Sequence, residues 1–360
     1  MSTEVTLIPG DGTGPVLVEC ARRVLDATGV GVSWDLQEAG RGTFEREGDP
    51  LPERVLDSLR TTSVALKGPL STPVEAPYPN VNLTLRQALD LYAGVRPSRL
   101  FPGVPSPYEG VDVVVVREMT EGMYTGIEFE EGAATTKELI EFIREETGRT
   151  IRDRSGISIK HISVHGSERI TRFAMRWAVA HGRSKVTAAH KANIMKFSDG
   201  LFLETARRVA RDEFPEVQFD DRIIDACCMQ LASAPERFDV LVLPNMYGDI
   251  VADLCAGLIG GLGLAPGGTF GEDVAVFEAV HGTGPRIKDP RRADPSALIL
   301  SGAMLLRHVG EPEAADAVER AVAAVLADGS AVTYDLRPRP GDPAASASEM
   351  TDAVVGRLTA

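Results

Sequence analysis

The sequence predicts an α/β fold, and three observations support this prediction. Runs typical of strands alternate with runs typical of helices along the 360 residues. The run Val111–Val116, which is apolar except for Asp112, is typical of a strand that is buried on both faces of a sheet. The composition, 43% hydrophobic and 25% charged, is that of a globular chain long enough for a large core. No linker divides the chain, so a second domain is expected as an insertion within the first.

The predicted elements follow one another in chain order. Strands are expected at Val5–Ile8, Val64–Lys67, Val111–Val116 and Val240–Leu243, and helices at Val16–Leu25, Ser167–Ala180, Ser296–His308 and Pro312–Ala327. Pro15 suits the first turn of a helix, with Thr13 or Gly14 as its cap. The segment Arg337–Ser348, rich in Pro, Ala and Ser, is expected as a surface loop before a final helix.

The net charge and the composition limit the kinds of molecule that the protein can bind. A net charge of −14 and a pI near 5.0 give a surface that repels phosphate backbones, so nucleic-acid binding is not expected. No apolar run approaches the ~20 residues of a membrane span. The four cysteines show no CxxC pairing and are expected to be packing residues. Without a visible signal peptide, a cytoplasmic location is expected.

Two aspartates carry the strongest chemical signal. Asp249 and Asp253 are four residues apart at the expected start of a helix, so both side chains lie on one helix face. Carboxylate oxygens are the ligands that Mg²⁺ and Mn²⁺ prefer. Asp225 is a candidate third ligand. The alternative is an ordinary solvated acidic face.

Three arginines suggest a site for an anionic substrate. Arg117 ends an apolar strand, and Arg86 and Arg96 occur in neighbouring segments. Guanidinium groups bind carboxylates with two parallel hydrogen bonds, so three converging arginines suit a substrate with two or three carboxylates. The alternative is scattered surface arginines, each paired with a nearby glutamate.

Lys191 and Tyr124 are candidates for proton transfer. Lys191 follows an apolar strand and lies next to Asn193, which could bind a cofactor or substrate oxygen, while Tyr124 has glycines on both sides. A partly desolvated lysine near cations has a lowered pKa and suits acid–base work. A solvated lysine and a half-buried tyrosine are the simpler alternatives.

Two glycine-rich turns are candidate nucleotide-binding loops. Gly10–Gly14 follows the first strand, and His281–Pro285 follows an apolar run. Neither matches the GxGxxG or Walker A pattern, so either could be an ordinary turn.

Taken together, these motifs closely resemble those of the β-decarboxylating dehydrogenases, which act on isocitrate, 3-isopropylmalate, homoisocitrate, tartrate or D-malate. The similarity runs from Ile8 to about Tyr334 and includes Gly68–Pro73, Asp90–Ala93, Val116–Glu118, His190–Lys196, Pro244–Ile250 and His281–Thr283. It implies an isopropylmalate dehydrogenase-like fold with two α/β domains and a cleft between them. Residues 1–98 plus 248–360 would form the larger domain, and 99–247 the smaller, with a clasp at about 150–170 (Gly156–His165).

The resemblance also implies a homodimer with shared active sites and a role for each site residue. Lys191 and Asp225 would serve the partner's cleft, and Asp249 and Asp253 would complete a Mg²⁺ or Mn²⁺ site. Lys191, acting through Asp249 and water, would help to remove the hydroxyl proton as hydride passes to a nicotinamide cofactor. After loss of CO₂, Tyr124 would protonate the carbon. The cofactor would be bound by Thr72, Asn193, His281, Gly282, Thr283, Arg286, Asp294 and Tyr334.

The substrate and the cofactor are less sharply indicated. Isocitrate enzymes carry Ser-x-Asn before the first arginine, and these two side chains contact the third carboxylate. This chain has Asn80-Val81-Asn82, so Asn80 and Asn82 are expected to contact the substrate. Isocitrate, giving 2-oxoglutarate, is the leading expectation, and homoisocitrate, 3-phosphonomethylmalate and 3-isopropylmalate are the alternatives. A non-catalytic regulatory homologue is a further alternative. Arg286, where NAD enzymes carry an acid, favours NADP, while Ile287 is less supportive and leaves NAD open.

Overall fold

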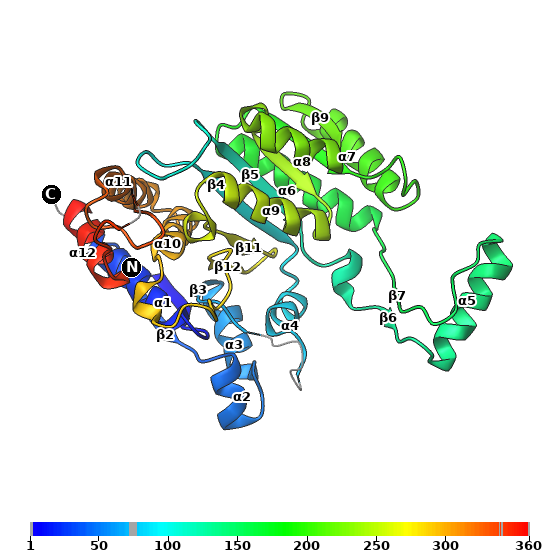
Figure 1. Ribbon diagram of the computed structural model, residues 1–360, viewed down its shortest axis with the longest axis horizontal. Coiled ribbons are helices and arrows are strands. Elements are labelled where there is room, and N and C mark those ends of the chain that lie inside the picture. The colour runs from blue at the N-terminus through cyan, green and yellow to red at the C-terminus, as the bar shows by residue number, and fades with distance from the viewer. Residues whose placement is uncertain (1–2, 72–77, 338, 340, 359–360) are drawn as a thin grey trace.

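The computed structural model describes residues 3–71, 78–337, 339 and 341–358, and a ten-stranded sheet runs through its body (Figure 1). The strand order is β2-β1-β3-β12-β11-β4-β5-β10-β8-β9. These strands are β1 Thr3–Ile8, β2 Val32–Leu36, β3 Val64–Lys67, β4 Ala93–Arg99, β5 Asp112–Glu118, β8 Lys185–His190, β9 Gln218–Ile223, β10 Val240–Leu243, β11 Gly268–Phe270 and β12 Ala275–Glu278.

The sheet consists of two parallel blocks joined by antiparallel strands. Strands β2, β1, β3 and β12 are parallel to one another, as are β5, β10, β8 and β9. Between the blocks, β12, β11, β4 and β5 pair antiparallel. This junction brings the carboxyl ends of β3 and β12 close to the middle of β4, and a charged cluster forms there.

Helices cover both blocks (Figure 1). In chain order they are α1 Gly14–Ala27, α2 Arg41–Glu47, α3 Glu53–Thr62, α4 Val81–Ala88, α5 Ala134–Thr147, α6 Val164–Ala180, α7 Asp199–Glu213, α8 Ile224–Ser233, α9 Asn245–Leu258, α10 Ser296–His308, α11 Pro312–Asp328 and α12 Ala347–Leu358. Short 3-10 turns lie at Gly122–Thr125, Pro235–Arg237, Leu262–Leu264 and Pro290–Arg292. None of the helices in the described part of the chain has the length and apolarity that a bilayer crossing requires.

The predicted elements are present, with shifts at their ends. The central apolar run forms the interior of β5, where Val113–Val116 are buried between β4 and β10. Helix α6 begins at Val164, three residues earlier than expected, because the Ser163 side chain accepts a hydrogen bond from Gly166 N and caps the helix. The expectation for Asp249 was wrong in one respect: α9 begins at Asn245, so both of its aspartates lie inside the helix rather than at its start.

One segment extends away from the body (Figure 1). It contains α5 and a small antiparallel sheet of β6 Glu128–Phe129 and β7 Ile157–Ser158, and β7 falls within the predicted clasp. The division into domains at residues 98 and 248 stays a prediction, since one continuous sheet crosses residue 98 where β4 pairs with β5.

Candidate active site

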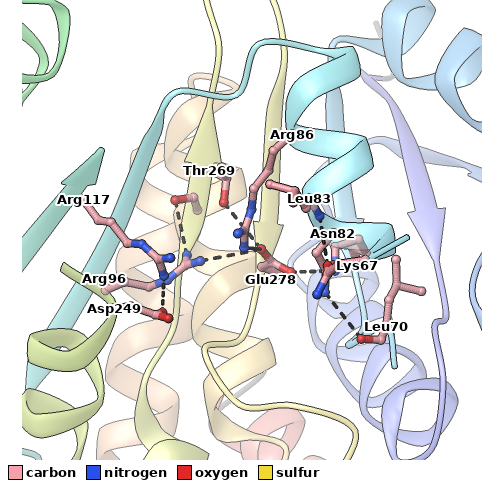
Figure 2. Close-up of polar contacts among 12 residues, drawn as sticks. Lys67, Leu70, Asn82, Leu83, Arg86, Arg96, Arg117, Asp249, Thr269 and Glu278 are labelled. Carbon is pink, nitrogen blue, oxygen red and sulfur yellow. Dashed lines mark hydrogen bonds and ion pairs between the residues drawn. The ribbon is translucent and has the colours of Figure 1, made fainter. Parts of the chain in front are cut away.

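A buried carboxylate at the end of β12 organises the site (Figure 2). Glu278 lies opposite Lys67, the last residue of β3, in the parallel register of these strands. Its Oε2 is 2.6 Å from Lys67 Nζ, and its Oε1 is 3.6 Å from Arg96 Nη2 and 3.9 Å from Arg86 Nη2. Two of the three arginines that the sequence indicated, Arg86 and Arg96, therefore converge on Glu278, a residue that the sequence did not indicate.

The cluster is held out of water, and this changes its titration. Burial alone would raise the pKa of Glu278, but Lys67, Arg96 and Arg86 outweigh burial and lower it to about 2. Burial, together with Arg117 and Arg96, lowers the pKa of Arg86 to about 10 against the opposing effect of Glu278. Glu278 and Arg86 are thus both charged at neutral pH.

A glycine makes this arrangement possible. A Cβ on Gly267, just before β11, would lie 2.0 Å from Arg96 Nη1. Only a residue without a side chain lets the guanidinium pass over the strand towards Glu278.

The second part of the site joins β5 to α9. Arg117 forms an ion pair with Asp249, and its Nε and Nη2 donate to Asn245 Oδ1 at 3.0 and 2.7 Å. The Arg117 side chain packs over Gly248, where an added Cβ would meet its Cγ at 2.6 Å. Gly248 lies inside α9 and makes room for Arg117.

Tyr124 lies against the same carboxylate. Its hydroxyl donates to Asp249 Oδ2, and the Arg117 guanidinium lies 4.8 Å from the centre of its ring. Burial and this hydrogen bond raise the pKa of Tyr124, with Arg117 opposing them. Tyr124 therefore carries its proton at neutral pH and is in contact with the carboxylate of the predicted metal pair.

Only two of the three predicted metal ligands lie together in one chain. Burial, and then the charge of Asp249, raise the pKa of Asp253, as expected for two carboxylates on one helix face. Asp225 instead pairs with Lys191 at the beginning of α8. Within the described residues, no group of three His, Cys, Asp or Glu side chains is close enough to hold a metal ion.

The Lys191–Asp225 pair is open to solvent. The Lys191 side chain is 27% exposed and that of Asp225 is 66% exposed. Lys191 follows β8, which lies five strands from β12 in the sheet, or about 24 Å at the usual strand spacing. Asn193, on the same loop, is exposed and lies in a different part of the chain from the other predicted cofactor residues.

The two asparagines before Arg86 have different roles in the structure. Asn80 caps α4, because its side-chain oxygen accepts from Leu83 N at 3.0 Å. Asn82 joins the charged cluster, since its Oδ1 accepts from Lys67 Nζ at 3.2 Å (Figure 2). Asn82 is thus linked to the arginines through Lys67 and Glu278. The side-chain oxygen of Asn80, in contrast, already accepts the capping hydrogen bond.

The two glycine-rich turns contact one another. Thr13 N donates to Thr283 O at 3.1 Å, and a Cβ on Gly12 would meet that oxygen at 2.3 Å. Buried polar atoms without a partner lie in the same stretch of chain: His281 Nε2, Asp294 Oδ2 and Ser296 Oγ. Such atoms are expected where a polar ligand is missing.

Of the remaining predicted cofactor residues, Asp294 and Tyr334 have interactions that describe their surroundings. Burial, and then Asp335, raise the pKa of Asp294 well above its ordinary value. Tyr334 is 39% exposed, and the Arg292 guanidinium lies 5.2 Å from the centre of its ring. Gly282 and Arg286 lie in the turn after β12, and Thr72 lies outside the described residues.

Sequence reasoning missed Lys67, Glu278 and Asn245. Lys67 and Glu278 are charged residues that end apolar strands, which is the signal that identified Arg117. Asn245 follows the apolar strand β10 in the same way.

Comparisons with known proteins identify the family of this chain. The family model described as isocitrate/isopropylmalate dehydrogenase matches residues 4–354. A mitochondrial regulatory subunit of the NAD isocitrate dehydrogenase of Dictyostelium discoideum is 43% identical over 99% of this chain and 92% of its own length. An NADP isocitrate dehydrogenase of Archaeoglobus fulgidus is 39% identical over 97% and 91%.

A solved structure shows the same fold. The isocitrate dehydrogenase of Methylococcus capsulatus superposes with a TM-score of 0.90 at 49% identity, with both chains fully covered. The predicted α/β fold and the predicted family are therefore both confirmed. This chain belongs to the isocitrate/isopropylmalate dehydrogenase family.

Proposed function

We propose that this protein catalyses the oxidative decarboxylation of isocitrate to 2-oxoglutarate with a nicotinamide cofactor. The observation that carries the proposal is the cluster in which four cations, Lys67, Arg86, Arg96 and Arg117, face only two contacting carboxylates. The excess positive charge suits a substrate with several carboxylates. The names of the relatives, which include NAD and NADP isocitrate dehydrogenases, support the same reaction.

Different residues of the chain would bind the substrate and transfer protons. Arg86, Arg96 and Arg117 would bind the substrate carboxylates, and the buried ion pairs would hold these guanidiniums before the substrate arrives. Lys191, as a neutral amine and acting through Asp249 and water, would help to remove the hydroxyl proton. Tyr124, which is protonated at neutral pH, would return a proton to carbon after CO₂ has left.

The residues present fit a divalent cation and a nicotinamide cofactor. Asp249 and Asp253 repel one another, and a cation held between them would relieve this repulsion. Such a cation, Mg²⁺ or Mn²⁺, would supply Lewis-acid stabilisation of charge on the substrate oxygen. The partnerless atoms of His281 and Asp294 suit a polar cofactor, which would supply the hydride acceptor.

We further propose that the active site is shared between two copies of the chain. Asp225, which pairs with Lys191, does not join Asp249 and Asp253 in one group within the described residues, and this supports the arrangement because one chain alone leaves the metal site with two carboxylates. Assembly with a different kind of chain is the alternative. The similarity to the regulatory subunit of Dictyostelium discoideum is the specific reason to consider it. The cytoplasmic location stays a prediction.

For the cofactor we propose NADP, which Arg286 supports. Arg292, beside Tyr334, adds a second cation where a 2′-phosphate would bind. Relatives that belong to an NADP enzyme and to an NAD enzyme are similarly close, so the comparisons do not favour either cofactor.

A substrate and cofactor panel tests the proposal. Isocitrate, homoisocitrate, 3-isopropylmalate, malate, tartrate and 3-phosphonomethylmalate would each be assayed with NAD and with NADP in the presence of Mg²⁺. We expect the fastest reduction with isocitrate and NADP. Faster turnover of another 3-substituted malate would replace the substrate, and no reduction with any of them would favour the regulatory role.

A further inference from the structure

A second buried carboxylate, Asp199, lies behind the loop that carries Lys191. It is the first residue of α7 and is fully buried. Its Oδ2 accepts a hydrogen bond from Lys191 N at 2.7 Å, and its Oδ1 forms an ion pair with Lys160. The carboxylate therefore holds the main chain of Lys191, while the ammonium group of the same residue pairs with Asp225.

Asp199 also connects this loop to two other parts of the molecule. Lys160 belongs to the segment predicted as the clasp, and its Nζ lies 4.7 Å from the centre of the Tyr247 ring. Burial, and then the charge of Asp199 and a hydrogen bond to it, raise the pKa of Tyr247 to about 12. Tyr247 precedes Asp249 by two residues on α9, so Asp199 links the Lys191 loop to the helix that carries the predicted metal ligands.

The loop is fixed on its other side as well. His190 Nδ1 lies 3.0 Å from Ala192 N and can accept its hydrogen bond, while His190 Nε2 lies 3.1 Å from Asp221 Oδ1. The residues before and after Lys191 in this turn thus have set positions. Displacing the Lys191 backbone requires breaking a hydrogen bond to a buried, charged acceptor, which is among the stronger hydrogen bonds in proteins.

We infer that Asp199 is a positioning residue for Lys191, which sets the place of the Lys191 ammonium by holding its backbone against the clasp segment and α9. This inference rests on the proposed function, because it assumes that Lys191 transfers a proton. A group that is misplaced by ~1 Å can lose about 10²-fold in rate, so one buried carboxylate can matter for catalysis without touching the substrate.

The test compares Asp199→Asn with a matched control at the other end of the same strand. Asp239 Oδ2 accepts from Ser184 N at 2.8 Å and Lys185 N at 3.1 Å, so it holds the backbone at the beginning of β8 as Asp199 does beyond its end. We expect Asp199→Asn to lower kcat by about 10²-fold while KM for isocitrate changes little. Asp239→Asn should leave kcat unchanged.

A double-mutant cycle separates positioning from general destabilisation. If Asp199 acts through Lys191, adding Asp199→Asn to Lys191→Met should cause no further loss of kcat. A further loss in the double variant, or an unchanged kcat in Asp199→Asn alone, would overturn the inference. If Asp199→Asn does not fold, Tyr247→Phe decides the question: it removes only the hydroxyl contact to Asp199, and it should lower kcat and leave KM unchanged.

Three results distinguish this inference from the proposed function. A wild-type protein without dehydrogenase activity would reject the proposed function. An active wild type whose Lys191→Met variant is also active would reject the role of Lys191, and the inference with it. Loss of activity in Lys191→Met with normal activity in Asp199→Asn would reject the inference alone.

Discussion

The Glu278 cluster and the Lys191–Asp225 pair are both built from opposite charges, but their surroundings differ. In the cluster, the side chains of Lys67 and Glu278 are 1% and 11% exposed, and the sheet register sets their positions. In the pair, both groups are open to solvent at the ends of two elements. One region is completed within the chain, and the other presents its charged groups outward.

This difference indicates how each region contributes to the site. A buried charge cluster is expensive to desolvate and depends on every member, so it fixes geometry at some cost in stability. An exposed ion pair contributes little to stability, and its partners can be removed without unfolding the protein. Substitutions in the cluster should therefore affect folding and binding, while substitutions in the pair should affect catalysis alone.

The largest expected effect is on catalysis by the exposed pair. Lys191→Met should lower kcat by about 10² to 10⁴-fold, the range typical of a proton-transfer group. Because the side chain is partly solvated, the thermal midpoint of unfolding should hardly move. Steady-state kinetics and thermal unfolding provide the measurements, with the neighbouring Lys196→Met as control. A similar loss of activity in both variants would point to the loop rather than to the ammonium of Lys191.

The next effect is on stability in the buried cluster. Glu278→Gln leaves Lys67 and the arginines without their central anion, and should lower the free energy of unfolding by about 3–5 kcal/mol. Denaturant unfolding checks this value. Glu53→Gln, which breaks an exposed pair with Arg60, should change the stability little. Equal effects of the two substitutions would remove the distinction between the regions.

The same variant makes a prediction about pH. The pKa of Glu278 in the folded protein is about 2, below its ordinary value of 4.5. Its charge therefore stabilises the fold above pH 4.5, and this contribution is lost as pH falls towards 2. The wild type should show this step in an acid titration of stability, and Glu278→Gln should lack it.

A smaller effect is expected where shape rather than charge supports the cluster. Gly267→Ala places a Cβ against Arg96 and should lower the stability by about 1–3 kcal/mol and raise KM for the substrate. In Gly356→Ala the new Cβ meets nothing within 4 Å, so this helical substitution should be neutral or stabilising. If KM did not rise in Gly267→Ala, the position of Arg96 would not depend on the space that Gly267 leaves.

The last prediction concerns Asp294, a buried carboxylate. Burial raises the pKa of Asp294, so the folded state keeps its proton, and stability should fall as pH rises above the ordinary value of 3.8. Asp294→Asn removes this dependence. The melting temperature of the variant should therefore rise relative to that of the wild type as the pH increases. An unchanged pH profile would show that the carboxylate has a compensating partner.

The sequence predicts the individual elements of this site better than their arrangement. Arg117 and the Asp249–Asp253 pair were found because strand ends and the i, i+4 spacing are local patterns. Glu278 was missed because its role depends on β12 lying beside β3 and on β11 lying between β12 and β4, and no local pattern specifies that strand order. Asn80 was predicted as a substrate contact, although Ser, Thr, Asp and Asn are also the usual helix caps, and its side chain caps α4.

The central claim is that Lys191 of one chain and Asp249 of another act in the same cleft. It is tested most directly by mixing two inactive variants, Lys191→Met and Asp249→Asn, under conditions that allow the chains to exchange between dimers. Roughly half of the dimers would then be hybrid with one complete cleft each, so we predict recovery of about a quarter of wild-type activity. If mass measurement showed hybrid dimers but the mixture stayed inactive, the two residues would not act in the same cleft and the claim would be wrong.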